Sequence, residues 1–138
     1  MPLASLAIDA SAAVDLFNPN RPTPPPLETA GSLFLPLPIL GELLFGVLKS
    51  SPEWRDLNRS AVQRLAEKSV LLLPDIRTAE EYARIRTEKP LSADISRRRE
   101  THLINDLWTA ALCVQHDIPL LTNDRDFEGI TGLTIVRW

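Results

Sequence analysis

The fold of this chain is decided by residues 104–127, INDLWTAALCVQHDIPLLTNDRDF. Asp106 opens a mostly apolar helical pattern, and a short apolar strand is predicted after it at residues 118–122. This strand leads into a polar turn that contains Asp124 and Asp126. A lone carboxylate at the end of a buried element is costly, so Asp106 and Asp124 are expected to belong to a larger polar site.

Apolar segments of strand length alternate with helical patterns outward from this stretch. In addition to residues 118–122, strands are predicted at residues 5–8, 33–37, 69–73 and 133–137. Helices are predicted at residues 11–17, 39–49, 52–68 and 78–87. The arginines at 97–99 lead into a further predicted helix, the one that Asp106 opens, which ends near residue 116. Short apolar strands that alternate with helices are typical of a parallel sheet covered on both faces. The predicted fold class is therefore α/β: a single three-layer α/β/α domain over residues 1–138, with a mostly parallel sheet of four to five strands.

Prolines and capping residues add local expectations. Pro36 and Pro38 indicate either an edge position for the second strand or an early end to its pairing. Thr78 with Glu81 predicts a capping box at the start of a helix. Residues 18–26 hold five of the twelve prolines and predict a stiff surface loop, with a ligand for a proline-binding domain as the alternative.

Composition limits the class of protein. A length of 138 residues with 44% apolar and 24% charged residues is typical of one globular domain. The single Cys113 excludes an internal disulfide and fits a reducing compartment. The longest apolar stretch, residues 33–48, is too short and too interrupted to span a bilayer, and no basic leader precedes Asp9. We expect a soluble, cytoplasmic protein with no membrane partner.

The formal net charge of −3 argues against a bulk nucleic-acid binder, because phosphate contacts need Lys and Arg. The argument is weak, since a cluster of catalytic acids would itself lower the net charge. A local basic patch can coexist with such a cluster.

Four acids are predicted at one edge of the sheet. Asp9 follows the first strand, Asp124 follows the fourth, and Glu42 lies near the start of the helix after the second strand. Asp106 is expected near the start of its own helix, from where it can approach the same edge. Ligands of open α/β sheets bind beyond the carboxyl ends of the strands, so the topology favours convergence of the four. Each acid also has a plain alternative as a turn, solvated or helix-dipole residue, with Asn105 as the helix cap beside Asp106.

Crowded carboxylates need either protons or cations. Four of them, without nearby Cys or clustered His, form an all-oxygen set that suits Mg²⁺ or Mn²⁺ rather than Zn²⁺. Such ions activate water and stabilise charge on a phosphoryl group, so metal-dependent phosphodiester cleavage is the predicted chemistry.

The motifs around these acids resemble a known family. The segments IDASAAVDLF, PILGELLFGVLKS and GLTIVRW, together with residues 104–127, are similar to the PIN-domain ribonucleases, specifically the VapC-type toxins of bacterial type II toxin–antitoxin pairs. The resemblance runs over most of the chain and implies a PIN-like fold. Ala10 departs from it, because many members have Thr there, although Ser11 follows and can supply a hydroxyl.

The resemblance implies a role for each acid. Asp9, Asp106 and Asp124 would hold Mg²⁺ or Mn²⁺, and Glu42 would ligate the ion or orient and deprotonate the attacking water. Residues expected to support these catalytic acids are Ser11, Thr122 and Asp126, each with a plain turn or cap role as the alternative. Residues expected to contact RNA phosphates are Arg97, Arg98 and Arg99, with a solvated helix face as the alternative.

The same resemblance implies three partners: an RNA substrate, a cognate antitoxin that covers the acidic site, and a second copy in a homodimer. Two rival functions stay open. One is a catalytically silent PIN-fold binding module, and the other is a different acid-rich phosphohydrolase such as a phosphatase, which the lack of an Asp-x-Asp motif at Asp9 disfavours. His102 and His116 show no partner pattern, and Trp108 is expected in the core or a dimer interface.

Overall fold

The computed structural model describes residues 4–90 and 95–138, and their strands form one sheet. The strands are β1 (Ser5–Ile8), β2 (Ser32–Pro36), β3 (Val70–Leu72), β4 (Leu120–Leu121) and β5 (Ile135–Val136). All pairs are parallel, in the order β3-β2-β1-β4-β5. Ala7 of β1 pairs with Phe34 on one side and Leu120 on the other, so β1 lies at the centre. The predicted parallel α/β sheet is confirmed, with five strands.

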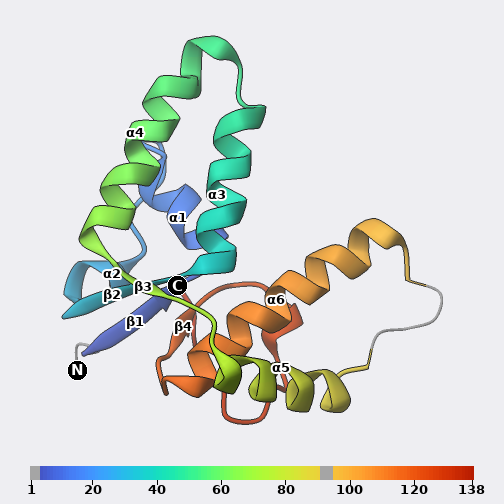
Figure 1. Ribbon diagram of the computed structural model, residues 1–138. Coiled ribbons are helices and arrows are strands. Elements are labelled where there is room, and N and C mark those ends of the chain that lie inside the picture. Colours follow the sequence, from blue (N-terminus) through green and yellow to red (C-terminus); the bar gives the residue numbers. More distant parts are fainter. Residues whose placement is uncertain (1–3, 91–94) are drawn as a thin grey trace.

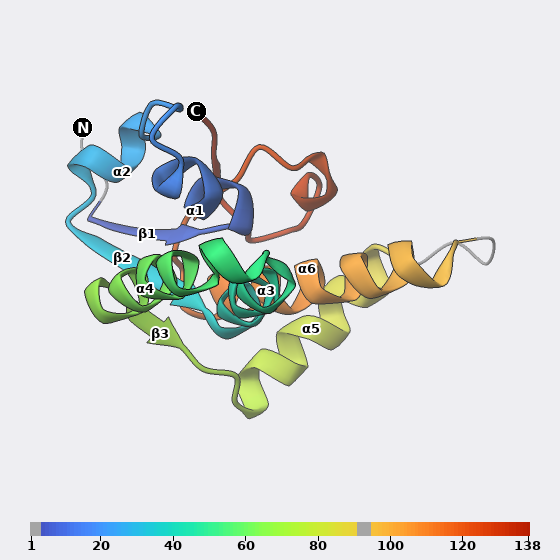
Figure 2. The same ribbon diagram turned by 90° about the horizontal axis from the view of Figure 1, so that it is seen from above.

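Helices cover both faces of this sheet. They are α1 (Ala10–Phe17), α2 (Pro25–Thr29), α3 (Leu37–Lys49), α4 (Pro52–Lys68), α5 (Ile76–Glu88) and α6 (Arg97–Gln115), with a 3-10 turn η1 (Arg125–Phe127). Figure 1 shows α1, α3 and α4 on one side of the strands and α5 and α6 on the other. The two views agree that α5 and α6 lie side by side (Figure 2).

Alternation along the strands explains the two layers. In β1, Leu6 and Ile8 pack with α1, α3 and α4, whereas Ala7 packs with α5 and α6. In β4, Leu120 and Leu121 divide in the same way. Successive side chains of a strand point to opposite faces, so a short apolar run contributes to both cores. This is the predicted three-layer α/β/α arrangement.

The α6 helix begins at Arg97, well before Asp106, whereas the sequence pattern placed Asp106 near the start of the helix. Ser96 is its N-cap and accepts a hydrogen bond from the backbone N–H of Arg99. Asp106 therefore lies in the middle of a 19-residue helix and not near its start, and Asn105 is an interior residue and not a cap. The arginines at 97–99 belong to the first turn. Half-buried Trp108 stacks on Tyr82 of α5, with ring centroids 4.1 Å apart.

The structure decides between the two alternatives for Pro36 and Pro38, and it corrects two further local expectations. β2 is an interior strand, and Pro36 pairs with Leu72 at its last position. The prolines therefore mark the end of pairing and the start of α3, where a missing N–H costs little. The helix predicted at Thr78 begins at Ile76, and the capping box joins Asp75 with Thr78 rather than Thr78 with Glu81.

The structure describes the whole proline-rich segment but only part of the segment before α6. Residues 25 and 26 begin α2, so the predicted loop of residues 18–26 is shorter than expected. Residues 89–96, which contain Pro90, interrupt the helical pattern of the sequence and are expected to form a break between two helices. Residues 91–94 of this break lie outside the described residues. Within the described part of the chain, no helix combines the length and apolar character that crossing a membrane requires.

Candidate active site

Asp9 is held in place where β1 ends. It is the N-cap of α1, and its Oδ1 accepts the backbone N–H of Ala10 at 2.8 Å. Its Oδ2 accepts the hydroxyl of buried Thr122 at 2.6 Å and that of Ser11 at 3.4 Å. The Thr122 hydroxyl oxygen in turn accepts the backbone N–H of Asp124 at 3.0 Å. Thr122 and Ser11 thus both contact Asp9, and Thr122 joins two acid-bearing segments.

Asp106 is the most deeply buried of the four predicted acids. Its exposed fraction is 5%, and its Oδ2 atom is fully buried without a hydrogen-bond partner among the described residues. Burial, followed by the negative charges of Asp124, Asp9 and Glu42, raises the pKa of Asp106 to about 8. The oxygen without a hydrogen-bond partner thus belongs to a carboxyl group whose pKa is raised by several surrounding acids.

The remaining predicted acids lie close enough to act on one another. Burial raises the pKa of Asp9, and the charge of Asp124 raises it further, against the hydrogen bonds from Thr122 and Ala10. Burial also raises the pKa of half-buried Glu42, and the charge of Asp9 adds to this effect. The structure therefore brings Asp9, Glu42, Asp106 and Asp124 within electrostatic range of one another. Of these four, Asp106 and Asp124 belong to the group whose potential ligand atoms lie within 4.8 Å of one another, whereas Asp9 and Glu42 lie outside that group.

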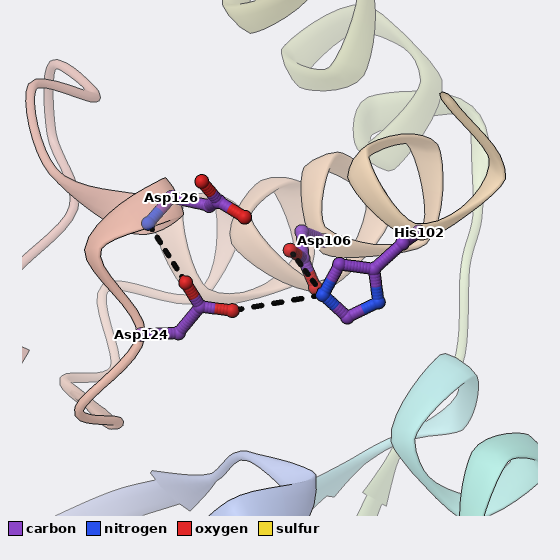
Figure 3. A group of neighbouring side chains, drawn as sticks. All are labelled: His102, Asp106, Asp124 and Asp126. Atoms are coloured by element: carbon purple, nitrogen blue, oxygen red, sulfur yellow. Dashed lines mark hydrogen bonds and ion pairs between the residues drawn. The ribbon is translucent and has the colours of Figure 1, made fainter. Parts of the chain in front are cut away.

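Two further residues complete the cluster. Asp124 caps η1, and its Oδ1 accepts the backbone N–H of Asp126 at 2.9 Å. His102 Nε2 lies 3.5 Å from Asp106 Oδ2 and 3.7 Å from Asp124 Oδ2. Figure 3 shows the imidazole of His102 facing both carboxylates. His102, Asp106, Asp124 and Asp126 each place one potential ligand atom within 4.8 Å of the others.

His102 is the residue that sequence reasoning missed. Residues four apart share one face of a helix, so His102 and Asp106 are neighbours once both belong to α6. The signal was present as a His-x-x-x-Asp spacing, but it was hidden because Asp106 was expected near the helix start. The expected all-oxygen donor set is therefore incomplete, because an imidazole nitrogen lies among the carboxylates.

The three arginines predicted to contact RNA lie in the first turn of α6, and each has different neighbours. Arg99 forms an ion pair with Asp126 at 2.7 Å, so one of the acids is already neutralised. Arg98 and Arg99 line a hollow of about 360 Å³ with Ser96 and His102. Arg97 is exposed at the first position of α6. Positive charge is thus available next to the acids.

A divalent cation fits this donor set. Carboxylates that raise one another's pKa values are stabilised in their charged form by a cation, and oxygen ligands suit Mg²⁺ and Mn²⁺. The buried, unpartnered Oδ2 of Asp106 is an acceptor of the kind that an ion would satisfy. Residues that could hold an ion here are Asp9, Asp106, Asp124, Asp126 and His102, with Glu42 at the edge of the group.

Comparison with known proteins agrees with this geometry. The PIN-domain family model matches residues 6–133. Ribonuclease VapC4 of Mycobacterium tuberculosis is 31% identical over 100 residues, which are 70% of each chain. Among solved structures, the DNA-bound VapBC of Salmonella typhimurium has a TM-score of 0.76 at 20% identity, with 99% of both chains covered. VapBC-5 of M. tuberculosis has a TM-score of 0.71 at 24% identity, with 98% of this chain and 99% of that chain covered. This chain therefore belongs to the PIN-domain family and, within it, to the VapC type.

Proposed function

We propose that this protein is a metal-dependent endoribonuclease and acts in the cytoplasm as the toxin of a toxin–antitoxin pair. Membership in the VapC type implies nuclease activity. The observation that carries the proposal is the electrostatic influence of Asp9, Glu42 and Asp124 on Asp106, whose buried Oδ2 has no hydrogen-bond partner in the described part of the chain. Mg²⁺ or Mn²⁺ is the proposed cofactor, and RNA is the proposed substrate.

Each side chain has a part in hydrolysis. Asp9, Asp106 and Asp124 hold the ion, and the hydroxyls of Thr122 and Ser11 keep the Asp9 carboxylate in one orientation. The bound ion supplies activation of water and stabilisation of charge on the phosphoryl group. Glu42 orients the attacking water and accepts its proton. Its raised pKa suits this role, because a stronger base takes up the proton more readily.

The N-terminal turn of α6 is the proposed RNA contact. Arg98 and Arg99 line the hollow next to His102, and Arg97 adds a third guanidinium at the same helix end. Guanidinium groups and a helix N-terminus both favour phosphate oxygens. Contacts to phosphates position RNA without reading its bases, so they support binding next to the acids rather than the choice of sequence.

The antitoxin is proposed to occupy an apolar groove that ends at the acids. The groove encloses about 530 Å³ between α1, α3 and α4, and its lining includes Val14, Phe17, Val47 and Glu42. Because Glu42 belongs to both the groove and the acidic cluster, a segment bound there would also cover the catalytic acids. The similar solved proteins are VapBC complexes, which agrees with a partner of this kind.

A homodimer is part of the proposal, with twice the 15.4 kDa chain mass expected by light scattering.

The test uses the antitoxin-free protein with RNA, in Mg²⁺ or in EDTA. Asp9→Asn and Asp106→Asn are compared with Asp56→Asn, which replaces an acid on α4 whose side chain is 98% exposed. We expect cleavage by the wild type and by Asp56→Asn in Mg²⁺ only, and none by the two site variants. Cleavage that persists in EDTA or in either site variant contradicts the proposal. An absence of cleavage of every RNA, with antitoxin binding retained, would favour the silent binding module.

A further inference from the structure

We propose that His102 is a direct ligand of the metal ion, so that the site has mixed oxygen and nitrogen donors and favours Mn²⁺ over Mg²⁺ more than a carboxylate site would. This inference rests on the proposed function and concerns the chemistry of the same site. It gives His102 a role, whereas the proposed mechanism with four acids assigns none to this side chain.

The position of the imidazole is the first argument. Nε2 of His102 lies 3.5 Å from Asp106 Oδ2 and 3.7 Å from Asp124 Oδ2, so a single atom faces both carboxylates (Figure 3). Both separations exceed the usual length of a nitrogen–oxygen hydrogen bond, about 2.7 to 3.2 Å. Ligand atoms around one ion face each other without bonding to one another. The three atoms are therefore arranged as donors to a shared centre rather than as a closed hydrogen-bonded group.

The second argument is the unsatisfied oxygen. Within residues 4–90 and 95–138, buried Asp106 Oδ2 has no hydrogen-bond partner, and it is the same atom that faces His102 Nε2. A buried carboxylate oxygen without a partner carries a large desolvation cost. A cation placed between this oxygen and the imidazole would remove that cost and use the nitrogen lone pair at the same time.

Competition within the cluster is the third argument. Asp126 is the other additional candidate, but its Oδ1 is bound to the guanidinium of Arg99 at 2.7 Å. Recruitment of that oxygen to an ion would weaken an existing ion pair. His102 has no such ion pair to lose, because the two salt-bridge partners found for it among the described residues are the proposed ligands Asp106 and Asp124.

The choice of metal follows from the nitrogen. Mg²⁺ prefers oxygen ligands and keeps several waters, whereas imidazole favours transition metals. In a given site, affinity rises from Mn²⁺ towards Cu²⁺. An imidazole in place of a water should therefore raise the affinity for Mn²⁺ and later transition ions while changing the affinity for Mg²⁺ little.

The test measures Mn²⁺ binding to the antitoxin-free protein by electron paramagnetic resonance, with Mg²⁺ as competitor. We expect pulsed spectra of the wild-type complex to show coupling of Mn²⁺ to a directly bound imidazole nitrogen. In His102→Ala this coupling should vanish, and the ratio of Mn²⁺ to Mg²⁺ affinity should fall by about tenfold or more. His116→Ala is the matched control, because His116 is the exposed C-cap of α6 and lies outside the cluster.

The outcomes separate this inference from the proposed function. Wild-type protein that binds Mn²⁺ and cleaves RNA, but shows no nitrogen coupling, overturns the role of His102 and leaves the nuclease intact. An unchanged affinity ratio in a folded His102→Ala variant does the same. Failure of wild-type protein to bind either ion would instead contradict the proposed function. The spectrum of the wild type needs no variant, so misfolding of His102→Ala would not obscure the result.

Discussion

The α6 helix and the α3–α4 hairpin cover opposite faces of the same sheet, and they leave different kinds of side chain without a partner. α6 buries the carboxylate of Asp106 among acids, with one oxygen unbonded. The hairpin exposes apolar side chains on both helices, including Phe45 at 61% and Leu48 at 64% on α3, and Trp54 and Leu57 on α4. Each arrangement is costly in the isolated chain.

The two regions therefore indicate two different ligands. Buried acids that raise one another's pKa values need a cation, whereas exposed apolar side chains need a protein surface. Glu42 is the link, because it belongs to α3, lines the apolar groove and interacts with Asp9. A partner on the hairpin and an ion at α6 would meet at this residue.

Loss of the Asp106 carboxylate should have the largest effect on activity. Asp106→Asn should lower the rate of RNA cleavage by more than about a hundredfold, because even residues that only support a metal ligand contribute about 10- to 100-fold. The variant should still fold, since an amide is neutral as the buried carboxyl is at its raised pKa. Cleavage rates with circular dichroism as a folding check measure this. A variant with more than a tenth of the wild-type rate would remove Asp106 from the catalytic set.

The same carboxylate should make stability depend on pH. The pKa of Asp106 is about 8 in the folded chain and about 4 when unfolded, so the folded state holds the proton more tightly. Stability in EDTA should therefore fall as pH rises from about 4 to about 8 and then level off. The raised pKa values of Asp9 and Glu42 act in the same direction.

Melting curves in EDTA test this dependence. We expect the melting temperature of the wild type to drop by at least about 5 °C across this range, and Asp106→Asn to show a smaller drop. Saturating Mn²⁺ should reverse most of the loss, because it binds the charged form. Equal pH dependence in both proteins would contradict the assigned pKa.

Two buried threonines form a matched pair near the acids. The Thr122 hydroxyl donates to Asp9 at 2.6 Å, whereas the Thr109 hydroxyl of α6 has no hydrogen-bond partner among the residues that the structure describes. Thr122→Val should cost about 1 to 3 kcal/mol of unfolding free energy and slow cleavage by about 10- to 100-fold. Thr109→Val replaces the same hydroxyl by the same methyl group, but it should leave the free energy of unfolding equal to that of the wild type or slightly higher, because no hydrogen bond to a described residue is lost. Chemical denaturation compares the two, and equal losses would show that shape rather than hydrogen bonding decides the effect.

Changes on the hairpin should have the smallest effect on the isolated chain. Phe45→Ser should alter the free energy of unfolding by within about 0.5 kcal/mol, because the ring is already exposed. Cleavage of RNA should stay unchanged, while binding of the antitoxin should weaken. Leu43→Ala, at a buried position of the same helix, is the contrast and should cost about 2 to 5 kcal/mol. Phe45 does not line the groove proposed for the antitoxin, so undiminished affinity in Phe45→Ser would contradict a contact with the exposed face of the hairpin and confine the partner to that groove.

The sequence by itself determined the features that depend on local pattern. The strands were predicted to within about two residues because their apolar runs alternate with helical periods, as in residues 5–8 and 118–122. Asp9 and Asp124 were placed at one edge because parallel strands carry their carboxyl ends to the same side. These inferences needed only the order of the elements along the chain.

Only the tertiary structure decided which side chains share the site with the acids. His102 lies near Asp124 because η1 packs against α6. This contact joins two separate elements, so the pattern within either one does not reveal it. Asp126 is tied to Arg99 through the same packing. The start of α6 also could not be judged from the apolar pattern, because its polar first half extends beyond the core and is capped by Ser96. Periodicity reports which residues face a core, whereas a donor set is defined by distances between separate elements.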